Sequence, residues 1–279
     1  MRSAYGDLVS NLDNYLGYSK VAVLLSPTVE SFALLSLALG LESPRVDYII
    51  VDRGMDFPWL RFLLFSLTPS AQVYRPPLKQ SPYYLIFRRG YLPPHSTFRW
   101  YTRLFFDTLP DLSRYDYVLM GSNRTTLNPK KRFIVKYEGD FGVSYSLFPT
   151  TKTVFPFAKR DHTFLLEMIA EHFPDVVKFF SLGARGGCMF CVGEEYERTA
   201  EIARDIGVFG ASRIYALRRY FLTNAFKSSN RVIDEKGYPR GLNLDFRIRL
   251  YSRMKFDFLY LNDKVPGYLP DLSPFSPEE

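Results

Sequence analysis

The chain is short of the residues that build disulfide frameworks and metal sites. Its 279 residues include only two cysteines, three histidines and two tryptophans. Two cysteines three positions apart exclude a disulfide-rich secreted scaffold and fit a reducing compartment. Three uses remain open for Cys188 and Cys191: a redox pair, part of a metal site, or a structural turn. We favour the turn, because a lone Cys-x-x-Cys is a weak signal for either chemistry.

Long uninterrupted apolar segments are also missing. Residues 21–41 are nearly all apolar, but Pro27 and Glu30 interrupt them. This predicts a buried strand followed by a helix and not a membrane span. No basic stretch leads into a short apolar run at the start of the sequence, so we expect no secretory signal and a cytoplasmic protein.

The remaining pattern predicts an α/β fold. Strand-like apolar runs alternate with helix-like stretches from residue 21 to about residue 119, which favours a doubly wound, parallel sheet. An amphipathic helix is expected over residues 1–20. Residues 133–137 and 141–145 read as the two arms of a β-hairpin that covers one end of the sheet.

Glycine is absent from the loop that joins the first expected strand to the helix after it. Residues 21–25, 26–31 and 32–41 read as strand, tight loop and helix. Such a loop binds phosphate through backbone N–H groups at the start of the helix, and glycines let the backbone turn toward the anion. Here Pro27 removes one N–H donor, and the β-branched Thr28 resists a positive φ. Taken alone, this loop is also an ordinary helix start with an acidic first turn.

Further segments follow in a fixed order. A second strand, residues 46–51, ends in Asp-Arg-Gly-Met-Asp-Phe-Pro, and residues 99–104 read Arg-Trp-Tyr-Thr-Arg-Leu. A third strand ends in Gly-Ser-Asn-Arg at residues 121–124, with more basic residues at 130–132. Residues 154–161 lead into a helix, and residues 179–191 end in Gly-Cys-Met-Phe-Cys. Loops after parallel strands lie at the carboxyl edge of the sheet, where ligands of such folds bind.

Together these segments, covering about residues 20–192, resemble the phosphoadenosine-phosphosulfate reductase family within the wider group of PP-loop adenine-nucleotide hydrolases. The family's loop is Ser-Gly-Gly-x-Asp-Ser, of which Ser26 and Ser31 match and Glu30 replaces aspartate. The resemblance implies an adenine-nucleotide-binding domain at residues 1–192 and the following contacts for the nucleotide: Ser26, Glu30, Ser31, Asp52, Gly54, Arg99, Arg124 and Arg132.

The departures from the family pattern imply a weakened site. An adenine nucleotide, ATP or a sulfonucleotide, is the expected ligand, and any surviving chemistry would be attack at its α-phosphate or sulfonate. Tyr101 replaces a family cysteine, and four thiolates are needed for an iron–sulfur cluster, so we expect none. No cysteine follows Cys191, which argues against sulfate reduction by the family's mechanism. A pseudoenzyme is the simplest reading.

Residues 193–279 read as a helical and β extension. Helices are expected at 194–206 and 211–226. Apolar residues at even positions from 242 to 250 alternate with polar ones, which predicts a half-buried strand, and residues 254–258 continue the alternation in a second run. The Pro- and Ser-rich stretch from Val265 is expected to wrap a surface or to stay disordered.

The positive charge is concentrated in this extension. Residues 213–255 hold eleven lysines or arginines and three acids, in a chain of net charge +7. Interleaved aromatics suit RNA or single-stranded DNA, and the candidate contacts are Arg218, Arg219, Arg247 and Arg249. The alternative to a nucleotide-site protein is therefore a non-enzymatic subunit that binds nucleic acid or a protein partner. A merely solvated basic face is the competing explanation.

Overall fold

The computed structural model describes two compact units. The described residues are 2–91, 105–124, 127, 135–148, 150–182, 194–237 and 239–277. Unit 1 comprises Met1–Val51, Leu64–Tyr74 and Leu109–Leu182, and unit 2 comprises Asp52–Leu63, Arg75–Thr108 and Gly183–Glu279. The boundary expected between residues 192 and 193 falls outside the described residues and stays a prediction.

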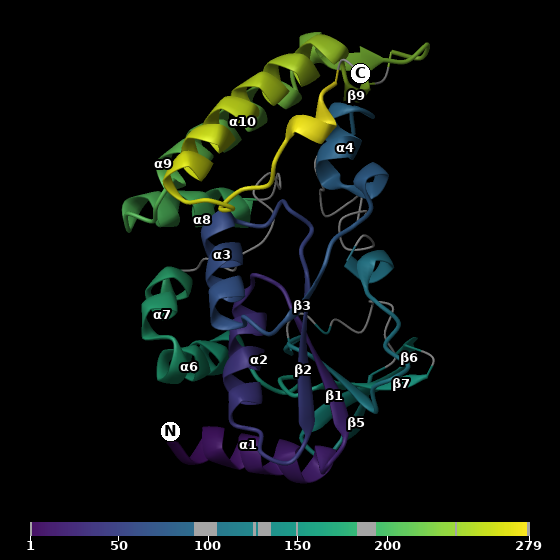
Figure 1. Cartoon of the computed structure of the whole chain (residues 1–279), viewed down its shortest axis with the longest axis vertical. Coiled ribbons are helices and arrows are strands. Elements are labelled where there is room, and N and C mark those ends of the chain that lie inside the picture. Colours follow the sequence, from purple (N-terminus) through teal and green to yellow (C-terminus); the bar gives the residue numbers. More distant parts are fainter. Residues whose placement is uncertain are drawn as a thin grey trace. The chain divides into compact units, whose positions relative to one another are not determined.

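Unit 1 is built on a seven-stranded sheet (Figure 1). Its strands are β1 (Lys20–Leu25), β2 (Arg45–Val51), β3 (Gln72–Tyr74), β4 (Tyr117–Met120), β5 (Lys136–Glu138), β6 (Phe141–Phe148) and β7 (Thr151–Phe155). The order is β3-β2-β1-β4-β7-β6-β5, and β6 runs in the opposite direction to the other strands of this sheet. The expected α/β class with a largely parallel sheet is confirmed. The expected hairpin is confirmed in β5 and β6, and it extends the sheet at one edge.

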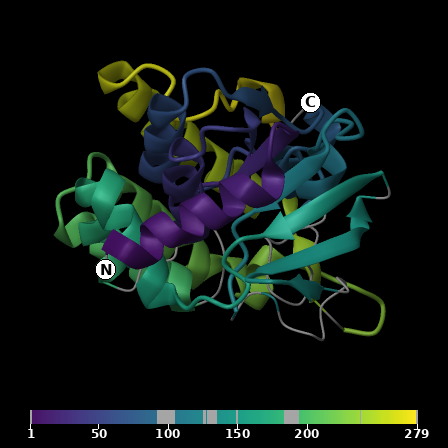
Figure 2. The same cartoon turned by 90° about the horizontal axis from the view of Figure 1, so that it is seen from below.

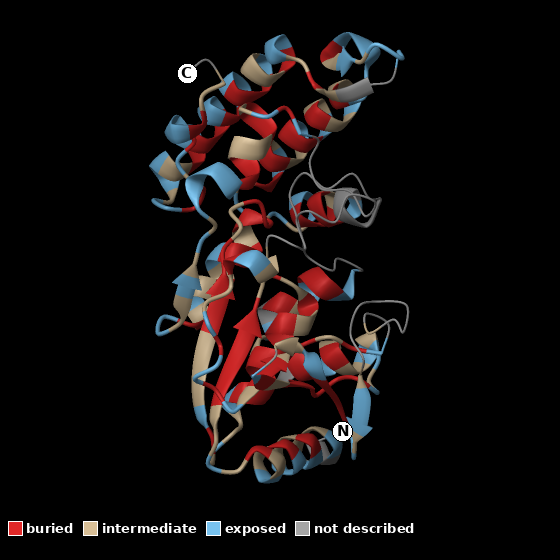
Figure 3. Cartoon of the chain, turned by 90° about the vertical axis from the view of Figure 1, so that its right-hand side faces the viewer, coloured by how far each residue is buried: buried red, intermediate tan, exposed pale blue. Residues whose placement is uncertain are grey.

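The central strands owe their position to their apolar sequence. In β1 every residue from Val21 to Leu25 is buried, because strands on both sides and helices exclude water. A parallel strand buried on both faces reads as a continuous apolar run, and that run made β1 predictable. Figure 3 shows the buried part of the sheet in red.

Helices α1 (Arg2–Leu16), α2 (Val29–Leu39), α6 (His162–His172) and α7 (Pro174–Ser181) complete unit 1. Helix α1, which crosses the sheet end in Figure 2, buries Leu8, Leu12 and Leu16. Helix α2 packs against α6, where Ser36 Oγ donates to the carbonyl of Met168 at 2.9 Å. Helix α3 (Pro58–Leu67) is divided between the two units at residue 64.

Unit 2 is mainly helical. It contains α4 (Pro82–Phe87), α8 (Glu194–Asp205), α9 (Ala211–Ala225), α10 (Leu244–Lys264) and the two-stranded sheet of β8 (Arg231–Ile233) and β9 (Pro239–Leu242). The expected helices after residue 193 are confirmed as α8 and α9. The core forms where α9 and α4 meet α10, and its largest buried apolar side chains include Phe87, Phe221 and Phe246.

The strand predicted over residues 242–250 is wrong, because residues from Leu244 onward form helix α10. Asn243 caps this helix, its side chain accepting from the N–H of Phe246 at 2.9 Å. Phe246, Leu250, Met254 and Phe258 are buried at intervals of four, a spacing that also fits alternation. Ile248 and Phe256, which alternation would also bury, are not buried, so the burial follows the period of a helix. The second strand predicted over residues 254–258 is therefore wrong as well.

The segment after α10 folds back onto unit 2. Tyr268, Leu269, Leu272 and Phe275 are all buried, which confirms the first of the two expectations for this segment. Within the residues that the structure describes, no helix combines the length and apolar character needed to cross a membrane.

Candidate functional site

The loop after β1 is a compact turn held by its own hydroxyl groups. The N–H of Ser26 donates to Ser31 Oγ at 2.9 Å, and the two hydroxyl oxygens lie 3.3 Å apart. Thr28 is the N-cap residue of α2, with extended backbone angles and a side chain that accepts from the Ser31 N–H at 3.4 Å. One of the N–H groups that a phosphate would use is thus already bonded.

The loop after β4 abuts the loop after β1. Strands β1 and β4 are parallel neighbours, with Leu24 beside Met120, so both chains leave the sheet at its carboxyl edge. A Cβ atom on Gly121 would lie 2.5 Å from the carbonyl oxygen of Glu30, which only glycine avoids. The two loops therefore touch backbone to backbone.

Arg124 is an exposed basic residue at this edge within unit 1. It follows the buried Asn123, its N–H donates to the carbonyl of Arg160 at 3.1 Å, and the residue is exposed. An exposed guanidinium near a helix start is suited to an anion, because it supplies charge-assisted and bidentate hydrogen bonds. Ser26, Glu30, Ser31 and Arg124 thus gather at one edge of the sheet, as the sequence predicts.

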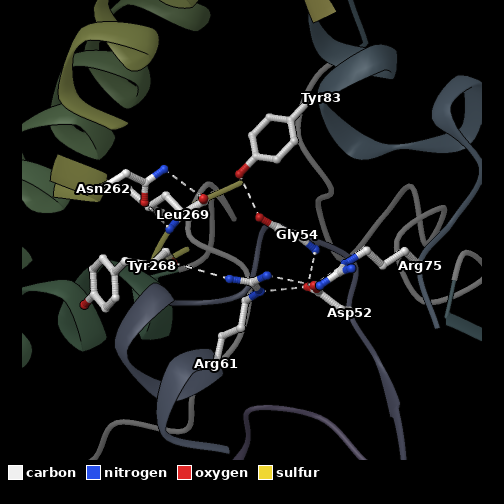
Figure 4. A network of polar contacts seen from close by, with 8 residues as sticks. All are labelled: Asp52, Gly54, Arg61, Arg75, Tyr83, Asn262, Tyr268 and Leu269. Atoms are coloured by element: carbon white, nitrogen blue, oxygen red, sulfur yellow. Dashed lines mark hydrogen bonds and ion pairs between the residues drawn. The ribbon is translucent and has the colours of Figure 1, made fainter. Parts of the chain in front are cut away.

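Asp52 and Gly54 lie in unit 2, where they form a different structure (Figure 4). The Asp52 carboxylate accepts two hydrogen bonds from Arg61, from Nε and Nη2, both at 2.8 Å. It also accepts from Arg75 Nε and from the N–H of Gly54, each at 3.0 Å. Asp52 is 4% exposed and Arg61 7%, whereas the Arg75 side chain is 65% exposed. This buried group, the Asp52 clamp, is a bidentate ion pair with one solvent-facing partner.

The charges of the clamp stabilise one another. Burial alone would raise the pKa of Asp52, but the hydrogen bonds and positive charges of Arg61 and Arg75 outweigh burial and hold this pKa below its ordinary value. Conversely, Asp52 raises the pKa of Arg61 against the effect of burial. Asp52 is therefore an anion in the folded protein, with its lone pairs engaged inside unit 2.

The clamp also holds the C-terminal segment. Arg61 Nη1 donates to the carbonyl of Tyr268 at 3.3 Å, and Tyr83 donates to the carbonyl of Gly54 at 2.7 Å. Asn262 exchanges two hydrogen bonds with the backbone of Leu269 beside it. In Figure 4 these contacts join the segment after β2 to the chain that follows α10. A nucleotide role for Asp52 and Gly54 stays a prediction.

The four arginines expected on a partner surface have different environments. Arg218 is 1% exposed, so its assignment to a surface is corrected: it sits among the buried residues of α9. Arg247 donates to the carbonyls of Phe87 and Arg88 at 2.8 and 2.7 Å, which makes it a link between α10 and α4. Arg219 and Arg249 are exposed, as a surface role requires.

Several predicted site residues lie outside the described part of the chain: Arg99, Arg132, Cys188 and Cys191. Among the residues that are described, no cluster of three or more histidines, cysteines or acids could hold a metal ion. Arg61 and Arg75, by contrast, are ion-pair partners of Asp52 that sequence reasoning missed. The one local signal is that Arg61 is the single charged residue of the largely apolar helix α3, which indicates a buried ion-pair partner.

No family model matches the chain, and no curated protein matches it. Among solved structures, it is similar to the U34-tRNA thiolase NcsA from Methanococcus maripaludis with its 4Fe–4S cluster. The two share 14% sequence identity over 90% of this chain and 87% of that chain, with a TM-score of 0.43. A likeness at this level concerns the arrangement of the chain and carries no argument about ligand or activity.

The same comparison corrects one expectation. The thiolase structure is solved with a 4Fe–4S cluster, and this finding stands against the expectation that no iron–sulfur cluster is bound, while the cluster itself is a property of the thiolase. That expectation depended on the cysteine count, and both cysteines lie outside the described residues. It is therefore withdrawn.

Proposed function

We propose that unit 1 is an adenine-nucleotide-binding module of the PP-loop group, with a weakened phosphate loop and without the sulfate-reducing activity of the reductases that its sequence resembles. The observation that carries the proposal is the contact between the loops after β1 and β4 at the carboxyl edge of the parallel sheet. Ligands of open parallel α/β folds bind at this edge. The start of α2 and the exposed Arg124 give it a positive character.

The weakening follows from two residues of the loop. Pro27 has no N–H, and the side chain of Thr28 already accepts from the N–H of Ser31. Each hydrogen bond lost to a charged ligand costs about 1.5–3 kcal/mol, which is roughly tenfold to a hundredfold in affinity. We therefore infer a dissociation constant well above that of an intact glycine-rich loop.

Thermal unfolding in the presence of nucleotide tests the proposal. A ligand that binds only the folded state at about ten times its Kd adds about 1.4 kcal/mol of stability. Millimolar ATP, AMP or sulfonucleotide should therefore raise the Tm by a few degrees, and Arg124→Ala should remove most of the shift. Arg45→Ala, an exposed arginine at the start of β2, is the matched control and should keep the shift. A Tm unchanged by all three ligands would contradict the proposal.

A further inference from the structure

We propose that the exposed surface along α9 and α10 binds single-stranded nucleic acid. The inference goes beyond the nucleotide module, because every residue it uses lies in unit 2. We call this surface the basic–aromatic seam, and define it by six residues of the two helices: Arg213, Tyr220, Arg249, Arg253, Phe256 and Tyr260.

The seam is continuous along α10. Arg249, Arg253, Phe256 and Tyr260 follow one another at intervals of four, three and four residues, which places them on one stripe of a helix. Each of the four is exposed. The side of the same helix that packs into the core contains Leu250, Met254 and other apolar side chains. The four seam residues of α10 are not needed for this packing.

Helix α9 supplies the other side of the seam. Helices α9 and α10 pack together, and Arg213 lies over the ring of Tyr260 at 3.7 Å from its centroid. Arg253 lies over the ring of Tyr220 at 4.5 Å. These contacts order guanidinium groups and rings into alternating pairs, so the side chains are held in place before any partner binds.

The charge of the seam suits a phosphate backbone. Arg253 and Arg249 are exposed, and among the described residues neither forms an ion pair with a carboxylate, although Arg249 donates to the Asn230 amide oxygen at 2.9 Å. Arg213 is the exception, since it pairs with Asp257 at 2.7 Å. Two arginines are thus available to phosphates, and Arg213 serves mainly to position Tyr260.

The rings of the seam suit unpaired bases. Phe256 is 67% exposed and Tyr260 44%, although large apolar side chains are normally buried. Surfaces that bind single strands combine a basic track with aromatic platforms on which successive bases stack. A protein partner would also use exposed rings and arginines, but Arg249 and Arg253, which have no carboxylate partner among the described residues, favour phosphates alternating with bases. We therefore commit to a single strand of RNA or DNA.

Fluorescence anisotropy with labelled oligouridylate and oligothymidylate, measured over a series of salt concentrations, tests the charge of the seam. Arg249→Gln with Arg253→Gln should flatten the log–log dependence of affinity on salt by about 1.4 on single strands. Lys236→Gln with Lys255→Gln removes the same charge from exposed positions of unit 2 off the seam and should leave the slope nearly unchanged. A change of similar size in both double variants would overturn the proposal.

The rings are tested separately. Phe256→Ala with Tyr260→Ala should weaken binding about tenfold or more with little change in the salt slope, because stacking involves no counterion release. Duplex DNA should bind more weakly than either single strand. Failure of both single strands to bind at low salt, or equal affinity for duplex, would overturn the proposal and leave a protein-docking face. Nucleotide-induced stabilisation, which concerns unit 1, stays unchanged in all these variants.

Discussion

The loop after β1 and the loop after β2 leave neighbouring parallel strands, but their polar groups have different partners. Ser26, Thr28 and Ser31 bond mainly to one another and leave the start of α2 with a half-exposed cap. Asp52 instead holds a buried arginine and anchors the segment around Tyr268. The buried ion pair thus gives Asp52 a structural role inside unit 2, while its nucleotide role stays a prediction.

The largest expected effect breaks the Asp52 clamp. Asp52→Ala leaves Arg61 buried without its carboxylate, and removing one partner of a buried pair costs about 3–5 kcal/mol. Arg75→Ala, which removes the exposed partner, should cost no more than about 1 kcal/mol. Urea unfolding of both variants measures the difference. An equal loss of unfolding free energy in Asp52→Ala and Arg75→Ala would show that the buried Arg61 contributes no more than the exposed Arg75.

A smaller effect is expected where the loops after β1 and β4 touch. Gly121→Ala places a methyl group against the Glu30 carbonyl, and such overpacking costs about 1–3 kcal/mol. Gly6→Ala in α1 meets no atom within 4 Å and should stabilise the protein by up to about 1 kcal/mol. The comparison is made by thermal unfolding of the two variants beside the parent. A neutral Gly121→Ala would mean that the two loops are not in contact.

The smallest effect is the response of the clamp to acid. Because the pKa of Asp52 is lowered in the folded state, its contribution to stability is complete above the ordinary value of 3.8 and is lost as pH falls through the lower folded value. The difference in unfolding free energy between the parent and Asp52→Asn should therefore shrink below this pH. Unfolding at a series of acidic pH values measures it, and a constant difference would contradict an ionised Asp52.

Much of unit 1 could be predicted because its signals are local. The apolar run of β1, the hairpin of β5 and β6 and the amphipathic α1 each follow from neighbouring residues. Helix α10 was missed because buried residues four apart also satisfy alternation, and the cap at Asn243 was the signal that would have decided for a helix.

The Asp52 clamp could not be predicted for a different reason. Its partners Arg61 and Arg75 lie 9 and 23 residues away, and no local pattern pairs them. The same holds for Arg218, whose burial depends on how α9 packs within unit 2. Charge counts along the sequence cannot separate such buried arginines from exposed ones.

The central claim is that the loop after β1 still binds nucleotide phosphate, but weakly because of Pro27 and Thr28. Isothermal titration of ATP into the variant Pro27→Gly with Thr28→Gly tests this claim directly. Restoring the N–H donor lost at Pro27, and the glycine backbone that can turn toward a phosphate, should lower Kd about tenfold or more relative to the parent. Thermal unfolding of the same variant establishes that the fold is retained. A folded variant that binds ATP no more tightly than the parent would contradict the account.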